Sequence, residues 1–300
     1  MNQQSTTVSL VLGSGGARGL AHIGVIRELE SRGYEIRAIA GCSMGALIGG
    51  IHAIGELETY ADWVSGLTQA DIFRLLDWSF SGGGLIRGTK LINKLKGLVG
   101  DRNIEDLPLD YTAVAVDIEK GREIWLDEGP LFDAIRASIA IPALVTPHQY
   151  RGHTLVDGGL LNPVPVEPTL RTLTDMTIIV DVNGKAARSR PLGRVDDDEE
   201  TGRGLLQRMR NYFGSTDSRF MSTEGGMPLS EVMMHSLDIM QGAITRQHLA
   251  VSQPDLIISI PKNTCMIHEF HLAEPVINLG RKLAREALEG RDADQQGESK

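Results

Sequence analysis

The chain has 300 residues, enough for one large domain with a sizeable core. Hydrophobic residues make up 41% and charged residues 23%, a balance that excludes a wholly disordered chain. The formal net charge of -9 and the absence of a strongly basic stripe argue against nucleic-acid binding, because phosphate contacts need a surplus of Lys and Arg.

Two consecutive strand–turn–helix units are predicted at the start of the chain. Each has a short aliphatic run, a glycine-rich turn and a helical pattern of apolar residues. The strands are predicted over 8–12 and 36–40, the turns over 13–16 and 41–45, and the helices over 20–29 and 46–54. Successive units of this kind predict a parallel sheet with right-handed crossovers.

The rest of the chain continues the alternation of strands and helices. Residues 56–100 are predicted as a helical flap over one edge of the sheet. Further strands are predicted over 111–116, 123–126, 154–156, 176–182 and 255–260, and further helices over 131–138, 230–251 and 274–288. The pattern predicts a single α/β domain over residues 1–290.

Two segments depart from this alternation. Residues 183–228, rich in Gly, Ser, Thr and charged groups, are interpreted as a mobile insertion that contains a candidate basic amphipathic helix over 205–213. Residues 291–300 are polar and are predicted to form a disordered tail.

A Gly-x-Ser-x-Gly turn lies between the second predicted strand and its helix. It consists of Gly41, Cys42, Ser43, Met44 and Gly45. This is the form of a nucleophile elbow, a strained turn that lifts the serine hydroxyl clear of the backbone. The glycines permit crowded or positive-φ geometry, and the following helix points its positive end at the serine. The turn favours Ser43 as a nucleophile over the alternative, a plain turn whose serine caps the helix.

A second glycine-rich segment, Gly13 to Gly19, follows the first predicted strand. In a parallel sheet it should lie at the same carboxyl edge as the elbow. Its amides can then form an oxyanion hole that holds the negative oxygen developing on an ester carbonyl. Dinucleotide binding is the rival interpretation, but the Gly-x-Gly-x-x-Gly pattern fails because Arg18 replaces its third glycine. Arg18 itself is consistent with binding a phosphate or carboxylate, or with an ordinary surface arginine.

A serine nucleophile needs a base, and none of the eight histidines has a convincing setting in the sequence. His148 with His153, and His268 with His271, lack a nearby cysteine or carboxylate in ligand spacing. No metal site and no metal cofactor are therefore predicted.

Asp157 is the alternative base. It leaves a short apolar strand and precedes Gly158 and Gly159, which keep the backbone accessible. If Asp157 lies within hydrogen-bond reach of Ser43, it can accept the hydroxyl proton directly, as in a two-residue Ser-Asp site. Taken alone, the same tripeptide favours the alternative, an aspartate that caps a β-turn.

Together these motifs resemble the patatin-like lipid acyl hydrolases, most closely the small single-domain bacterial patatin-like proteins. Three segments carry the resemblance in the family's order: 13–19, 41–45 and 157–159. Residues 137–142 and 162–165 also resemble stretches around the family's active site.

The resemblance implies a three-layer α/β/α sandwich with a mainly parallel central sheet. It implies Ser43 as the acylated nucleophile and Asp157 as the base. The elbow glycines are Gly41 and Gly45, and the oxyanion loop contains Gly15, Gly16, Ala17 and Arg18. Substrates of the family are phospholipids, lysophospholipids, neutral lipids and soluble ester surrogates, and no cofactor is implied.

Two functional hypotheses remain at this point. The first is a serine lipid acyl hydrolase of the phospholipase A, lysophospholipase or esterase type, in which apolar residues within 63–98 face lipid or simply cover the sheet. The alternative is a regulatory or protein-binding module with weak esterase activity that acts through residues 183–228.

The chain is expected to be cytoplasmic and to make, at most, peripheral contact with the inner face of a membrane. It has only two cysteines, its N-terminus lacks the features of a signal peptide, and no apolar run approaches about 18 residues. The sequence makes no prediction of oligomeric state.

Overall fold

The computed structural model describes residues 5–79, 84–187, 192 and 229–298. The strands of the central sheet are β1 (Thr7–Leu12), β2 (Glu35–Cys42), β4 (Asp110–Asp117), β5 (Arg122–Leu126), β7 (His148–Tyr150), β8 (His153–Asp157), β9 (Met176–Gly184) and β10 (Leu256–Pro261). β3 (Gly84–Ile86) and β6 (Ala143–Val145) form a separate pair.

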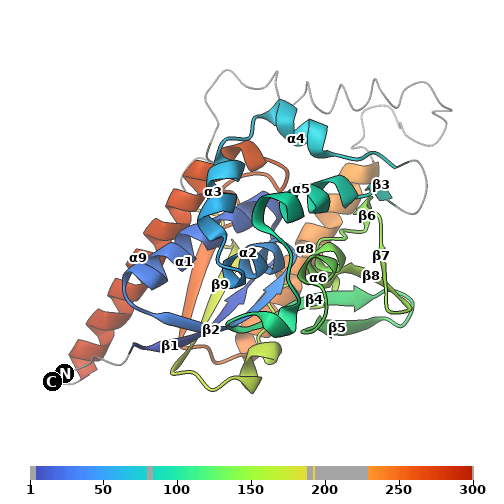
Figure 1. Ribbon diagram of the computed structural model, residues 1–300. Coiled ribbons are helices and arrows are strands. Elements are labelled where there is room, and N and C mark those ends of the chain that lie inside the picture. Colours follow the sequence, from blue (N-terminus) through green and yellow to red (C-terminus); the bar gives the residue numbers. More distant parts are fainter. Residues whose placement is uncertain (1–4, 80–83, 188–191, 193–228, 299–300) are drawn as a thin grey trace.

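The α-helices are α1 (Ala21–Ser31), α2 (Met44–Ala53), α3 (Leu57–Ser65), α4 (Gln69–Leu75), α5 (Thr89–Val99), α6 (Leu131–Ser138), α8 (Leu229–Val251) and α9 (Ala273–Glu298). Short 3-10 helices are η1 (Gly16–Leu20), η2 (Ile104–Asp106), η3 (Gly158–Leu160), η4 (Glu167–Arg171) and η6 (Phe270–Leu272). Figure 1 shows these helices arranged around the sheet.

The sheet is mainly parallel, as predicted. Its order is β10-β9-β1-β2-β4-β8-β7, with β5 also paired to β4. The five strands from β10 to β4 pair in parallel, whereas β5 and β8 run antiparallel to β4, and β7 runs antiparallel to β8. An antiparallel edge on a parallel sheet is common in α/β folds.

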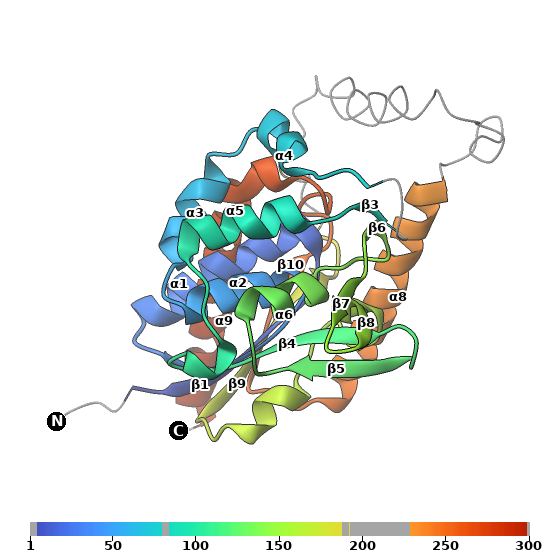
Figure 2. The ribbon, with the colours of Figure 1, turned by 45° about the vertical axis from the view of Figure 1, so that its right-hand side comes forward.

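Three layers follow from the alternation of side chains along the strands. Leu10 and Leu12 of β1 belong to the main core with α1 and α2, whereas Val11 points to the opposite face. On that face Val11 packs with Ile179 and, from α8, with Leu249. Figure 2 shows α8 apart from the group formed by α1, α2 and α6. The predicted three-layer α/β/α sandwich is therefore confirmed.

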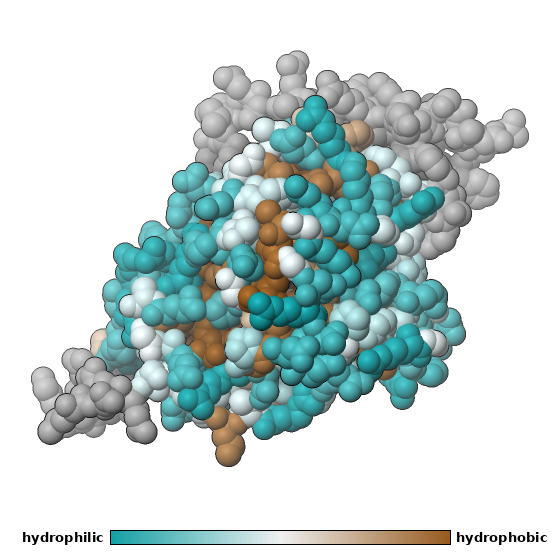
Figure 3. All heavy atoms as spheres, viewed as in Figure 1, coloured by the Kyte–Doolittle hydropathy of each residue, from teal (hydrophilic) through white to brown (hydrophobic). Residues whose placement is uncertain are grey.

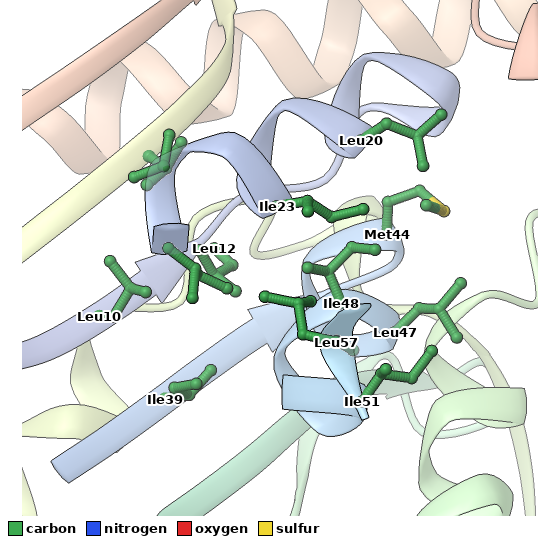
Figure 4. Packing of buried hydrophobic residues seen from close by; sticks show 14 of the residues in the cluster. Leu10, Leu12, Leu20, Ile23, Ile39, Met44, Leu47, Ile48, Ile51 and Leu57 are labelled. Carbon is green, nitrogen blue, oxygen red and sulfur yellow. The ribbon is translucent and has the colours of Figure 1, made fainter. Parts of the chain in front are cut away.

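The main core lies between the sheet and the helices α1 and α2. Figure 4 shows Ile23 of α1 and Ile48 of α2 pointing toward each other above β1 and β2. Both side chains are fully buried.

Figure 3, viewed from the same side as Figure 1, shows a surface that is largely hydrophilic, with groups of apolar residues visible between polar ones. None of the described helices combines the length and the apolar character needed to cross a membrane.

The structure changes two predicted boundaries. Residues 183 and 184 belong to β9, so the segment predicted as an insertion begins later; residues 188–191 and 193–228, including the candidate helix over 205–213, lie outside the described residues. The tail predicted to be disordered from residue 291 continues α9 to Glu298. Arg32, the residue after α1, supports this extension, because its guanidinium lies 4.0 Å from the carboxylate of Asp292 and 3.0 Å from that of Glu289 just before it.

Candidate active site

The predicted elbow joins the end of β2 to the start of α2. Ser43 has φ 54° and ψ -118°, a left-handed conformation that is costly for a residue with a side chain. Gly41 and Gly45 make the turn possible through close approach: a Cβ at Gly41 would lie 2.5 Å from Ala46 N, and one at Gly45 would lie 1.9 Å from Leu12 O. Ser43 therefore stands between a strand and a helix in the strained geometry of a nucleophile elbow.

A second serine holds the elbow in place. Ser138, at the end of α6 and fully buried, accepts a hydrogen bond from Ser43 N at 2.9 Å and donates one to Val114 O at 2.6 Å. This hydroxyl links the backbone of Ser43 to β4. The sequence placed Ser138 near the site only through the resemblance of residues 137–142, since the contact spans 95 residues.

Asp157, the last residue of β8, lies next to the elbow. Cys42 pairs with Val114 of β4, and the next residue of β4, Ala115, pairs with Asp157. The middle of β4 therefore brings the elbow and the aspartate to its two sides. Sequence reasoning predicted a strand-end carboxylate here, but not that its strand runs antiparallel.

The Asp157 carboxylate is almost completely buried, with 1% of its surface exposed. Its Oδ1 accepts a hydrogen bond from Gly159 N at 2.8 Å and a long one from Cys42 Sγ at 3.7 Å. Its Oδ2 has no donor among the described residues. Burial raises the pKa of Asp157 to about 6, although Ser43, Gly159 and Cys42 each act to lower it.

The Ser43 hydroxyl is thus close enough to lower the pKa of Asp157, yet it forms no well-aligned hydrogen bond to Oδ2. Catalytic hydrogen bonds are often long or poorly aligned before substrate binds. The arrangement can transfer the serine proton to an unengaged carboxylate oxygen.

The loop after β1 approaches the residues that follow Asp157, since a Cβ added at Gly159 would lie 3.0 Å from Ser14 Oγ, and it supplies two unengaged amides. Gly13 N and Ser14 N donate to Val180 O and Pro163 O. Gly15 N and Gly16 N have no acceptor among the described residues. Both glycines are required.

A Cβ at Gly15 would lie 2.3 Å from Val182 Cγ2. Gly16 has φ +56°, and its Cβ would lie 2.5 Å from Ile267 O. The close approach of Val182 and Ile267 to this loop therefore excludes larger residues at both positions.

The other two residues predicted for the oxyanion loop have different roles. Ala17 N donates to Ile267 O at 2.9 Å, so its amide is already engaged. The side chain of Arg18 is neither on the surface nor free for a phosphate: it is buried and forms an ion pair with Asp238 of α8 at 2.7 Å. Ile267, the partner of Ala17, and Asp238, the partner of Arg18, come from distant segments, which explains why the sequence did not reveal them.

The histidines of the described residues lie outside the Ser43–Asp157 pair. Among the described residues no histidine hydrogen-bonds to Ser43 or Asp157. His22 is fully buried, contacts Gly13 O through Nε2 at 2.8 Å, and has its pKa lowered by burial to about 4. The described part of the chain also contains no cluster of three or more His, Cys, Asp or Glu that suits a metal ion.

Comparison with solved structures supports the fold. VipD from Legionella pneumophila matches with a TM-score of 0.54 and 14% sequence identity, over 96% of this chain and 67% of that chain.

Sequence comparison identifies relatives over nearly the whole chain. An uncharacterized NTE family protein of Mycobacterium tuberculosis is 40% identical, with 97% of this chain and 93% of the relative aligned. The patatin-like phospholipase domain-containing protein 7 of Mus musculus is 32% identical over 59% of this chain and 14% of its own length. The family model described as patatin-like phospholipase matches residues 10–170. The chain therefore belongs to the patatin-like phospholipase family.

Proposed function

We propose that the protein hydrolyses fatty acyl esters of phospholipids or lysophospholipids through acylation of Ser43, with Asp157 as the base. Membership of the family supports lipid hydrolysis in general terms. One observation carries the finer proposal: the strained Ser43 lies beside a buried carboxylate with an unengaged oxygen and a raised pKa. A carboxylate with a pKa near 6 is a better general base at neutral pH than an ordinary aspartate.

In the acylation step, Ser43 Oγ attacks the carbonyl carbon of the ester and its proton passes to Asp157. The amides of Gly15 and Gly16 stabilise the negative charge that develops on the carbonyl oxygen. Collapse of the tetrahedral intermediate breaks the ester C–O bond. The proton held by Asp157 then goes to the departing alcohol, which leaves an acyl group on Ser43.

Water completes the reaction. Asp157 takes a proton from the water molecule that attacks the acyl-Ser43 carbonyl, and it returns a proton to Ser43 Oγ as the free fatty acid leaves. The two glycine amides stabilise this second oxyanion as they did the first. The cycle needs no histidine and no cofactor.

Turnover of a short-chain p-nitrophenyl ester tests the assignment. Ser43→Ala and Asp157→Asn should each lower kcat by at least about a hundredfold, because each removes a group that reacts directly. Ser9→Ala is a matched control: Ser9 is also a buried serine, but it lies in β1 and contacts Thr174 Oγ1 at 2.8 Å. Wild-type turnover in Ser43→Ala would refute the proposal.

The substrate class requires a separate experiment. Product analysis by mass spectrometry on mixed phospholipid and lysophospholipid vesicles, with wild type beside Ser43→Ala, should show serine-dependent release of fatty acids. Sedimentation with the same vesicles measures the peripheral membrane contact that such substrates would require. The alternative of a regulatory module depends on residues 183–228, and no contact of the described residues favours it.

A further inference from the structure

Two amides, those of Gly15 and Gly16, are proposed to hold the oxyanion. In each case a side chain donates a hydrogen bond to the carbonyl oxygen of the same peptide group and so orients the amide. The Gly15 amide shares a peptide with the Ser14 carbonyl, which accepts a hydrogen bond from Asn183 Nδ2 at 2.7 Å. The Gly16 amide shares a peptide with the Gly15 carbonyl, which accepts one from Arg18 Nε at 3.2 Å. Because a peptide group is planar, a bond that fixes the carbonyl also fixes the direction of the N–H.

Asn183 and Arg18 also bind each other. The Arg18 guanidinium donates from Nη2 to Asn183 Oδ1 at 2.9 Å and to Asp238 Oδ1 at 2.7 Å. It also donates from Nη1 to Lys262 O at 3.0 Å. One buried cation therefore connects the oxyanion loop to the end of β9, to the segment after β10, and to α8.

A second contact joins α8 to the same loop. Ser14 Oγ donates to Gln241 Oε1 at 3.4 Å, and Gln241 lies one helical turn from Asp238. Gln241 also adjoins the residues after the base, since a Cβ added at Gly159 would lie 2.4 Å from Gln241 Nε2. Between these contacts Ile239 is 70% exposed and Met240 is 47% exposed. This turn of α8 therefore faces the loop with the polar side chains of Asp238 and Gln241 and faces solvent with the apolar ones between them.

We infer that Asn183 and Asp238 are positioning residues that set the direction of the two oxyanion amides, with Arg18 as the link between them. This inference rests on the proposed function, because it concerns the amides that are proposed to hold the oxyanion. Asn183 acts on the peptide of the Gly15 amide directly. Asp238 acts on the peptide of the Gly16 amide through the guanidinium, whose buried charge it compensates.

The sharpest test is Asn183→Asp, which keeps an acceptor for Arg18 but removes the Nδ2 donor to the Ser14 carbonyl. Misplaced catalytic groups reduce rates strongly, so we expect kcat for a soluble p-nitrophenyl ester to fall about 10- to 100-fold. KM should change by less than about threefold, because the amides act mainly on the transition state. Asn103→Asp makes the same change at an exposed position and should leave kcat unaltered.

Asp238 is tested in parallel. Asp238→Ala should lower kcat about tenfold or more, and Asp238→Glu should restore part of the loss by returning a carboxylate to Arg18. Thermal unfolding and titration of active sites with a fluorophosphonate allow kcat to be expressed per folded, reactive site. A merely structural role would reduce the number of such sites and leave the kcat of each unchanged.

A trifluoromethyl ketone gives an independent readout, since it forms a tetrahedral oxyanion on a reactive serine. Its affinity should fall in Asn183→Asp by about the same factor as kcat/KM. Wild-type kcat and inhibitor affinity in both variants, with Ser43→Ala inactive, would overturn this inference alone. Full activity in Ser43→Ala would instead overturn the proposed function, and this inference with it.

Discussion

At the scale of single residues, the environment of Asp157 predicts how the rate depends on pH. Burial raises the pKa of this carboxyl to about 6, and only the deprotonated form can accept the serine proton. The kcat/KM for a soluble ester should therefore rise as the pH increases through about 6 and level off above it. A rate that is flat between pH 5 and 8 would contradict this assignment of the base.

Cys42 offers a way to shift that profile. Its thiol donates to Asp157 Oδ1 and acts to lower the pKa of the carboxyl. Cys42→Ala should therefore move the rising limb to higher pH, because the pKa of Asp157 increases when the donor is lost. The pH profile of kcat/KM measures the shift, and an unchanged or lower midpoint would show that the thiol does not act on the base.

The same carboxyl should also carry a cost in stability. Its folded pKa lies above the ordinary value of 3.8, so the folded state binds the proton more tightly and the penalty applies fully above pH 6. Asp157→Asn should thus inactivate the protein and yet raise its free energy of unfolding at pH 8 by up to about 3 kcal/mol. Urea unfolding measures this gain, which should shrink as the pH falls toward 4. Equal gains at both pH values would contradict the explanation.

At the scale of elements, the pairing of β4 with β2 and with β8 places the elbow and Asp157 close together. The strand–turn–helix pattern was sufficient to predict β1, β2, α2 and the elbow, because those features depend on residues close together in the chain. The pairing of β8 with β4 was not predictable in the same way. The apolar run at 154–156 indicates a strand but contains nothing that sets its direction, so the register of Ala115 with Asp157 emerged only from the structure.

The packing of α1 on α9 depends on two glycines at the closest approach. A Cβ at Gly24 would lie 1.9 Å from Ile277 O, and one at Gly280 would lie 2.1 Å from Ala21 O. Gly24→Ala should therefore force the helices apart and lower the free energy of unfolding by about 1–3 kcal/mol or more.

Gly97→Ala is the matched control for that change. Gly97 lies in α5, is exposed, and has no atom within 4 Å of an added Cβ. The control should stabilise the protein by about 0.5–1 kcal/mol, because alanine is the better helix former. Chemical denaturation of the two variants should give shifts of opposite sign, and equal shifts would refute the close-packing explanation.

At the scale of the whole molecule, the sequence was sufficient to predict the α/β class, and the resemblance to a family implied the three-layer sandwich. The glycine-rich loop, Ser43 and Asp157 were selected from local patterns, and the structure brings them together. Their catalytic roles remain predictions. The partners of Arg18 could not be predicted from local patterns in the sequence, because Asn183 and Asp238 lie 165 and 220 residues away.

The end of the chain was predicted wrongly for a different reason. Residues after Gly290 are polar, which favoured a disordered tail, but α9 continues to Glu298. Arg32, the residue after α1, pairs with Glu289 and with Asp292, so this part of α9 packs against the end of α1. Polarity alone therefore does not separate a frayed tail from a helix whose exposed face is polar.

The central claim is that Ser43 carries the acyl group, and covalent labelling tests it most directly. Wild-type protein treated with a fluorophosphonate and digested for mass spectrometry should show one adduct, on Ser43. Ser43→Ala should show none, and Asp157→Asn should react much more slowly. An adduct on another residue, or ester hydrolysis that persists in Ser43→Ala, would contradict the account.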